Sequence, residues 1–450
     1  MTMSELEAEY IRRSPRSKQL FDLACKLTPA GVHSNIRFFK PYPLFAARGE
    51  GSKISDVDGN EYIDYVLGQG ALFLGHAHPN VVKAVQEQAA KGSIYATANE
   101  LEVKLAHKVA KMIPCAEMVR FANSGTEALM HAVRVARAYT KRDKIVKFEG
   151  AYHGFWDDLY VGVSLPFDKP MSSGIPSSVA GNTLLLEFNK LEVVERAVRE
   201  NQVAAIVVEP VMGAGGSGIA AGVEYLKGLR EISTDNGIAL IFDEVITGFR
   251  MAPGGAQQYF GVVPDLTTLG KILGGGYPVG ALAGKREIMQ TIDPTKEGVR
   301  RWECAQHGGT FCGNPITMAA GLATLEEIDR AGGQLNNRVA RLCGKIRKDL
   351  NDLFLRYRVK ARAIGVGPSL GVFFTDGELK DARGLLSNDE EKRVAHCIWL
   401  ITKGIWHPPI KGWYVSTAHK DADIQALIDK TEDFLKTTRS QFSKKNVRTS

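Results

Sequence analysis

"AAIVVE" (204–209) and "GVEYLKGLREISTDNGIALIFDE" (222–244) decide the fold, because together they predict a strand, a helix and a second strand. The first segment is a short apolar run that ends in a carboxylate, which is typical of a strand buried on both faces. Residues 222–237 have apolar side chains at helical spacing, and 238–244 repeat the short apolar run. Two such strands joined by a helix form the repeating unit of an α/β fold.

The same alternation continues toward the N-terminus. We expect helices over 99–113, with Asn99 as its N-cap, and over 124–140, and strands over 118–123 and 144–148. These elements predict a mostly parallel sheet with helices on both faces.

The two ends of the chain have different patterns. Alternating apolar residues around Asp-Gly-Asn in 52–66 predict a hairpin. Beyond about residue 320, long helical patterns with strand candidates at 369–375 and 412–418 indicate a smaller α+β domain. The expected division is an N-terminal arm and hairpin (1–75, part of the small domain), a large α/β domain (76–320) and a C-terminal small domain (321–450).

Composition excludes several classes of function. The chain has 450 residues, of which 57 are basic and 50 acidic, and its net charge is +7. Because the basic and acidic residues are mixed along the chain and form no basic stripe, the sequence does not predict a nucleic-acid partner. No apolar run is long enough to cross a bilayer, and the polar start is unlike a secretory signal. Six scattered cysteines without a CxxC pair are typical of reduced thiols in a cytoplasmic protein.

Polar residues follow the predicted strands, where α/β proteins bind ligands. Ser124, Gly125 and Thr126 open a helix after 118–123, which suits a phosphate, although taken alone they are better explained as an N-cap. After 144–148 come Tyr152, which could stack on a flat ligand, and His153.

Three charged residues lie among apolar ones. Glu209 and Asp243 end apolar strands, and a buried acid needs a partner, although structural ion pairs would give the same pattern. Lys271 lies among apolar residues and glycines in "DLTTLGKILGGGYPVG" (265–280), with no carboxylate after Asp265. An isolated amine there either reaches solvent or is placed to react.

Pyridoxal phosphate explains these residues jointly. The cofactor needs an amine for a Schiff base, a carboxylate for its pyridinium nitrogen and donors for its phosphate. A dinucleotide site is a weaker alternative: "GAGGSG" (213–218) matches G-x-G-x-x-G, but the next helix begins too late to face a pyrophosphate. A metal site is weaker still, because His76 and His78 have no further ligands in register.

Longer motifs resemble one enzyme family. "FDEVITGFR" (242–250) and "PDLTTLGKILGGGYPVGALAG" (264–284) are similar to the signature of class-III pyridoxal-phosphate aminotransferases. "NSGTEA", "KFEGAYHG", "VVEPV", "GTFCGNP" and "FFTD" most resemble the glutamate-1-semialdehyde aminomutase branch. The resemblance runs from about residue 20 to 435. It implies a fold-type-I transferase, with a mostly parallel, seven-stranded sheet in the large domain and a smaller α+β domain.

The resemblance also implies roles for individual residues. Lys271 would be the Schiff-base lysine and proton shuttle, Asp243 the partner of the pyridine nitrogen, and Tyr152 the residue stacked on the ring. Thr310 would bind the phosphate from the neighbouring subunit of a homodimer, and Ser34 and Arg37 would bind the substrate carboxylate. The implied catalytic residues are Lys271, Asp243 and Tyr152, and the implied cofactor-binding residues are Ser124, Gly125, Thr126, Tyr152, His153, Glu209, Asp243, Val245, Lys271 and Thr310.

Departures from the aminomutase pattern bear on the reaction. The glycine-rich segment after the stacking tyrosine is replaced by "VGVSLPFDKPMSSGIPSS" (161–178), Lys411 lies near the position of a pocket glutamate, and His33 replaces an Asn. We therefore predict an intermolecular aminotransferase that moves an amino group between an amino donor and an oxo acid. The aminomutase is the first alternative, an amino-acid racemase the second, and a cofactor-binding protein without turnover is an alternative of a different class.

Overall fold

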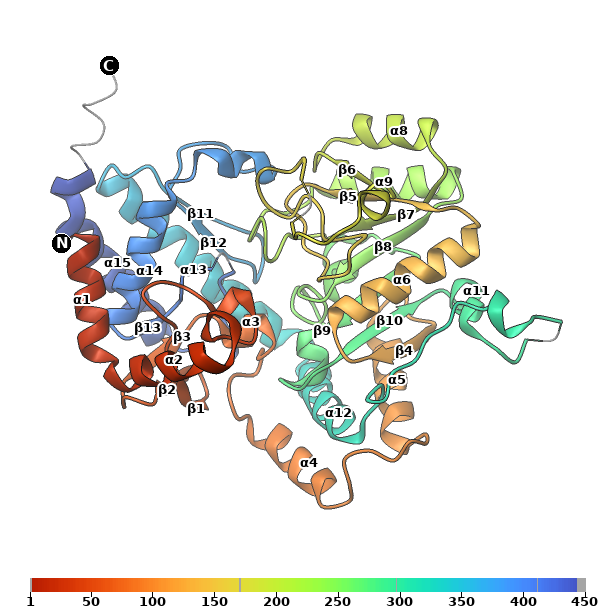
Figure 1. Cartoon of the computed structure of the whole chain (residues 1–450), viewed down its shortest axis with the longest axis horizontal. Helices are drawn as coiled ribbons and strands as arrows, with labels where there is room; N and C mark the ends of the chain where they lie inside the picture. The colour runs from red at the N-terminus through yellow and green to blue at the C-terminus, as the bar shows by residue number, and fades with distance from the viewer. Residues whose placement is uncertain (1, 170, 297, 411, 443–450) are drawn as a thin grey trace.

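The computed structural model describes residues 2–169, 171–296, 298–410 and 412–442, and its largest sheet has seven strands, which lie in the right half of Figure 1. Its strands, in spatial order, are β4 (Met118–Ala122), β10 (Gly280–Gly284), β9 (Leu266–Gly270), β8 (Ala239–Glu244), β7 (Val203–Val208), β5 (Lys144–Phe148) and β6 (Thr183–Leu186). Strand β10 runs antiparallel to both of its neighbours, whereas the strands from β9 to β6 pair in parallel. The prediction of a mostly parallel, seven-stranded sheet is therefore confirmed.

Helices cover both faces of this sheet. Alternate residues of β7 and β8 enter two different apolar clusters: Ile206 and Phe242 pack with α8 (Leu191–Glu200) and α9 (Val223–Asp235), whereas Val207 and Ile241 pack with α6 (Gly125–Thr140). Because successive side chains of a strand point to opposite faces, a strand covered on both faces is apolar throughout. This arrangement accounts for the uninterrupted apolar runs in the sequence.

The two ends of the chain pack together beside the sheet, at the left of Figure 1. A second sheet has the order β1 (Ala46–Glu50), β2 (Lys53–Asp56), β3 (Glu61–Asp64) and β13 (Ile405–Trp406), so the N-terminal hairpin pairs with a C-terminal strand. The predicted hairpin of 52–66 is confirmed as β2 and β3. Helix α1 (Met3–Arg13) packs on α14 (Glu390–Thr402), and α13 (Gln334–Arg356) packs on α15 (Asp421–Phe442).

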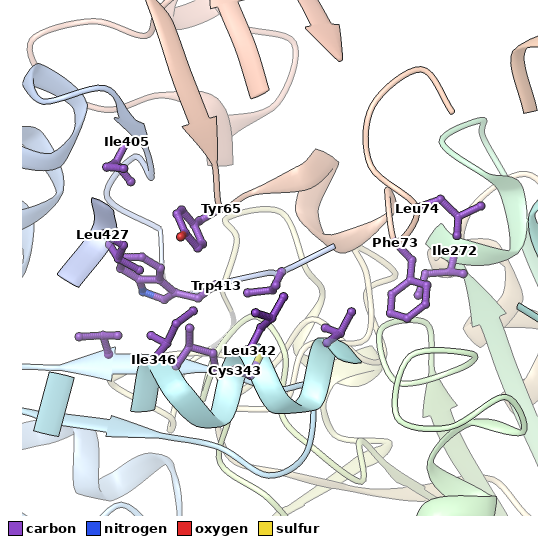
Figure 2. Packing of buried hydrophobic residues seen from close by; sticks show 14 of the residues in the cluster. Tyr65, Phe73, Leu74, Ile272, Leu342, Cys343, Ile346, Ile405, Trp413 and Leu427 are labelled. Atoms are coloured by element: carbon purple, nitrogen blue, oxygen red, sulfur yellow. The ribbon is translucent and has the colours of Figure 1, made fainter. Parts of the chain in front are cut away.

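An apolar core joins these end segments. Figure 2 shows Leu342, Cys343 and Ile346 of α13 facing Trp413 and Tyr65, with Leu427 and Ile405 close by. In the same view Phe73 and Leu74 group with Ile272, which follows Lys271. The core therefore extends from the C-terminal helices to the segment that carries the predicted reactive lysine.

The structure also contains further helices, short turns and a small two-stranded sheet. The other helices are α2 (Pro15–Leu27), α3 (Leu67–Gly70), α4 (Pro79–Ala89), α5 (Glu100–Met112), α7 (Ser177–Ala180), α10 (Gly255–Phe260), α11 (Arg286–Met289) and α12 (Pro315–Arg330). Short 3₁₀ turns occur at Pro29–Gly31, Asn35–Arg37, Lys271–Gly274, Gln290–Ile292, Arg301–Glu303 and Ala382–Ser387, and β11 (Arg362–Ile364) pairs with β12 (Gly371–Phe373). No helix among the described residues is both long and apolar enough to span a membrane.

One predicted strand is wrong. Residues 412–418 form no strand; Trp413 makes only an isolated bridge to Leu370. The alternating apolar pattern arises because Trp413 and Val415 pack into the core from an irregular segment. The strand predicted over 369–375 is present but shorter, as β12.

Candidate active site

A cavity of about 410 Å³ lies where the segments following β4, β5, β7, β8 and β9 converge. Its lining comprises Ala71, Asn123, Ser124, Gly125, Thr126, Leu129, Tyr152, His153, Gly154, Glu209, Asp243, Val245, Ile246, Lys271, Gly276, Tyr277, Pro278 and Val279. All the predicted cofactor-binding residues except Thr310 are in this set. The carboxyl ends of parallel strands share one edge of a sheet, which explains how residues 150 positions apart come together.

The N-terminus of α6 forms one wall of the cavity. Ser124 is the N-cap, and its hydroxyl accepts a hydrogen bond from the backbone N–H of Glu127 at 3.2 Å. A Cβ added at Gly125 would lie only 3.0 Å from a methyl of Val245, so glycine lets the helix end approach the strand β8 segment closely. Among the described residues, none accepts a hydrogen bond from the backbone N–H groups of Gly125 and Thr126, the first two of this 16-residue helix, so both are available to an anion.

Asp243 is held on both of its oxygens. His153 Nδ1 lies 2.7 Å from Asp243 Oδ2, and the backbone N–H of Val245 donates to Oδ1 at 3.1 Å. Burial lowers the pKa of His153, which favours the neutral ring, although its bond to Asp243 opposes this effect. A neutral imidazole that donates from Nδ1 leaves Nε2 as an acceptor, and this buried atom has no hydrogen-bond partner among the described residues.

Glu209 is a second buried carboxylate beside the first. Its oxygens accept hydrogen bonds from the backbone N–H groups of Tyr152 and Gly213, both at 2.8 Å. Burial raises the pKa of Glu209, and the negative charge of Asp243 raises it further. Glu209 therefore ties the loop that carries Tyr152 to the segment after β7.

Lys271 directly follows β9 and lines the cavity in a half-buried position. Its backbone has φ of +46°, a left-handed conformation that is uncommon for a residue with a side chain and occurs often at functional sites. Burial lowers the pKa of its amine, while the carboxylates of Asp243 and Glu209 oppose that effect. Among the described residues, none forms a hydrogen bond with Nζ, so the amine is available to a ligand in the cavity.

Tyr152 contributes an aromatic wall. Its ring packs edge-on against Phe155 and Tyr160, with centroid separations of 5.7 and 6.4 Å. The backbone N–H of Phe155 also donates to Thr126 Oγ1 at 3.3 Å, which joins the loop to the start of α6.

Three predicted site residues lie outside the cavity lining. Thr310 is exposed in the loop before α12, Arg37 is exposed in a 3₁₀ turn, and Ser34 is half-buried just before it. The guanidinium of Arg37 forms no ion pair with any described residue. Lys411 lies outside the described residues.

The alternative sites in the sequence have structural explanations. A Cβ at Gly213 would lie 2.0 Å from Ile246 Cδ1, and one at Gly215 would lie 1.9 Å from the carbonyl oxygen of Gly150, so these glycines allow close packing. Helix α9 begins only at Val223, well after the glycines. His76 binds Asp64 at 2.7 Å, and the described residues contain no group of three side chains that could hold a metal ion.

Sequence reasoning missed several lining residues. Asn123 and Gly154 lie inside the quoted motifs, and Tyr277 follows the glycines after Lys271, so their positions carried a signal. Tyr277 is 37% exposed and shows that the cavity reaches the surface. Ala71 comes from the N-terminal part of the chain, and nothing in its local sequence indicates this placement.

Comparisons with known proteins show the family to which the chain belongs. The family model for class-III aminotransferases matches residues 37–407. Glutamate-1-semialdehyde 2,1-aminomutase of Methanocaldococcus jannaschii is 44% identical over 93% of this chain and 97% of that protein. An omega-transaminase from Sphaerobacter thermophilus has a TM-score of 0.88 and 35% identity over 94% of this chain and 98% of its own. A transaminase solved with PLP bound has a TM-score of 0.86 and 29% identity, covering 95% and 99%.

Proposed function

Because this chain belongs to the class-III aminotransferases, which are fold-type-I enzymes acting with pyridoxal phosphate on small molecules, we propose that the cavity beside Lys271 is the cofactor and reaction site. The observation that carries the proposal is the convergence of an amine, a buried carboxylate, a helix N-terminus and an aromatic ring in one 410 Å³ cavity.

The residues present fit the cofactor. Pyridoxal phosphate, when bound, supplies an aldehyde that joins amines and a pyridine ring that accepts electrons from the substrate carbon. Lys271 would join the aldehyde, and Ser124, Gly125 and Thr126 at the start of α6 would bind the phosphate. Tyr152 would lie against the ring, and Val245 would pack beside it.

Asp243 would hold a proton on the pyridine nitrogen. Its carboxylate is already oriented by His153 and by the backbone N–H of Val245, so little ordering is needed when the ring arrives. The neutral His153 ring donates a hydrogen bond to the carboxylate without competing for the negative charge as a second cation would.

Lys271 would move the proton that the reaction requires. When its amine is free, Nζ would take a proton from the substrate carbon that carries the amino group and return it at another carbon. The burial that lowers the pKa of this amine favours its neutral form, which is the form that accepts a proton.

The proposed reaction is the intramolecular amino transfer of a glutamate-1-semialdehyde 2,1-aminomutase. It is supported by relatives such as the 44% identical archaeal aminomutase, which favour it over the intermolecular aminotransferase predicted from the sequence departures. Arg37, a cation without an ion pair among the described residues, is proposed to bind the substrate carboxylate with help from Ser34.

An intermolecular aminotransferase is the second candidate. The solved omega-transaminase is 35% identical over nearly the whole chain, and the segment 161–178 lacks the glycine-rich pattern of aminomutases. In that reaction an amino donor and an oxo-acid acceptor would use the same cavity in turn.

One experiment separates the two reactions. The purified holoenzyme is given glutamate-1-semialdehyde alone, and the isomer with its amino group on the terminal carbon is measured. Parallel reactions pair a panel of amino donors with 2-oxoglutarate or pyruvate. Isomer formation without an acceptor supports the aminomutase, whereas product that requires an oxo acid supports the aminotransferase; turnover in neither assay contradicts both.

The active unit is proposed to be a homodimer in which Thr310 reaches the phosphate of the neighbouring subunit. Thr310 lies outside the cavity of its own chain and next to Phe311, which is 59% exposed. Trp302, in the same surface loop, is 73% exposed. Large exposed apolar side chains are typical of a surface that another protein covers.

A further inference from the structure

Lys147 is a buried cation that the proposed reaction does not use. It lies on β5 with an exposed fraction of 0%. Its Nζ donates three hydrogen bonds, to the carbonyl oxygens of Val161 at 2.6 Å, Leu159 at 2.8 Å and Ala151 at 3.0 Å. Burial lowers the pKa of its amine to about 7, and the charges of Glu209 and Asp243 oppose this shift. No carboxylate among the described residues forms an ion pair with it, so its direct partners are the three backbone oxygens.

These three carbonyls belong to the two limbs of one loop, residues 149–161, which we name the 149–161 loop. Ala151 lies on the limb that leaves β5, and Leu159 and Val161 lie on the returning limb. A backbone bond from Gly150 N–H to Gly162 oxygen, 2.8 Å long, closes the loop at its base. The ammonium therefore joins both limbs just inside that closure.

The 149–161 loop carries two lining residues of the cavity. Tyr152 and His153 directly follow Ala151, whose carbonyl accepts one bond from Lys147. His153 in turn contacts Asp243 at 2.7 Å. A connected series of contacts thus runs from the Lys147 ammonium through the loop backbone to the carboxylate at the centre of the cavity.

We propose that Lys147 is a positioning residue of the cofactor site: its ammonium binds the two limbs of the 149–161 loop together and so holds Tyr152 and His153 in place. This inference rests on the cofactor site proposed above. The carbonyls of Ala151, Leu159 and Val161 lie in buried residues, and without the ammonium they would lack a donor in a place that water does not readily reach. The loop would then open to hydrate them, and its two site residues would move.

The test compares Lys147→Met with Lys144→Met. Lys144 is on the same strand, but its Nζ donates to Asn201 at 2.7 Å and contacts neither limb of the loop. Hydrogen exchange of the apoenzyme is measured over 151–161 and over β8 and α9, and the dissociation constant for pyridoxal phosphate is measured by its absorbance. For Lys147→Met we expect exchange over 151–161 to rise and cofactor affinity to fall by about tenfold or more, because several buried acceptors lose their donor. For Lys144→Met we expect neither change.

The outcomes separate the inference from the proposed function. If the Lys147→Met protein does not fold, Lys147→Gln, which keeps two N–H donors on a shorter side chain, is measured in the same way and should show a smaller change of the same kind. If the exchange over 151–161 and the cofactor affinity equal those of Lys144→Met, the positioning role is overturned. It is also overturned if exchange rises equally in β8 and α9. A wild-type protein that binds no cofactor at Lys271 would instead contradict the proposed function.

Discussion

Asp243 is prepared for its proposed task by residues that are distant in the sequence. The contacts with His153 and the Val245 backbone leave the carboxylate little freedom to turn, and its side chain is only 5% exposed. A carboxylate that must hold a proton on a ligand benefits from such prior orientation, because the cost of ordering it is met during folding.

Asp243→Asn should therefore weaken cofactor binding. An amide cannot hold the ring nitrogen in its protonated form, and the loss of a charge-assisted hydrogen bond lowers affinity by about tenfold to a hundredfold. The dissociation constant for pyridoxal phosphate checks this expectation. Asp265→Asn is the control, because Asp265 is also buried and pairs with Lys285 at 2.6 Å but lies outside the cavity. Equal losses in both variants would contradict the assignment.

The sequence predicts which residues belong to the site where a polar side chain interrupts or ends an apolar run. Lys271 and Asp243 stand out for this reason, and both line the cavity. Ala71 and Ile246 could not be predicted, because an apolar residue has the same local pattern in a core and in a cavity wall. The position of Arg37 relative to the site also depends on tertiary contacts that no local pattern encodes.

At the scale of elements, α6 combines structural and proposed binding roles. Ser124 caps the helix through the Glu127 backbone N–H, while Gly125 and Thr126 beside it line the cavity. A cap and an anion site are compatible because one side-chain oxygen satisfies only some of the unpaired donors at a helix start.

Ser124→Ala should lower stability and also weaken phosphate binding. Loss of an N-cap costs about 1 kcal/mol of unfolding free energy. The affinity for pyridoxal phosphate should fall, whereas the affinity for pyridoxal, which has no phosphate, should stay the same. Asp389→Ala is the matched control, since Asp389 caps α14 through the Lys392 backbone N–H at 3.0 Å, far from the cavity in sequence and outside its lining. If Ser124→Ala weakens both ligands equally, the phosphate assignment is wrong.

Most elements of the large sheet could be predicted, and the exceptions have physical causes. Strand β5 spans the predicted 144–148, and β8 covers 239–244. Strands β6, β9 and β10 are not among the predicted strands, and β10, "GALAG", lacks the large β-branched residues that mark a strand. Its small residues are required by packing: a Cβ at Gly280 would lie 2.0 Å from the carbonyl oxygen of Ser124.

For the whole molecule, buried histidines connect stability to pH. The His396 ring is 1% exposed and packs against Phe374 and Phe434, and burial lowers its pKa from the ordinary 6.5 to about 3, with Arg393 adding to the effect. At a pH between these two pKa values, His396 binds a proton in the unfolded chain but not in the folded chain. The free energy of unfolding should therefore fall by about 1.4 kcal/mol per pH unit from this residue as the pH decreases through that window. Above the ordinary value the contribution stays constant.

Denaturant unfolding of the wild type and His396→Gln checks this expectation. The free energy of unfolding is measured at about pH 7.5 and about pH 5. The wild type should lose more stability than the variant on acidification, because glutamine does not titrate. Identical losses would show that His396 does not contribute.

The proposed homodimer leads to a second prediction for the whole molecule. Lys271→Ala and Thr310→Ala should each be strongly impaired alone, yet a mixture of the two, unfolded and refolded together, should recover activity. If Thr310 serves the neighbouring subunit, each mixed dimer has one intact site, and random pairing restores about a quarter of wild-type activity. If both residues served the same subunit, no mixed dimer would contain an intact site and the mixture would stay inactive.

The most direct test of the central claim is to locate the covalent bond between the cofactor and the protein. The holoenzyme is reduced with borohydride, digested, and mapped by mass spectrometry, with Lys271→Ala treated in parallel. The account predicts a pyridoxyl group on the peptide that contains Lys271 and no label or visible chromophore in the variant. Label on another lysine, or a variant that keeps both chromophore and activity, would contradict it.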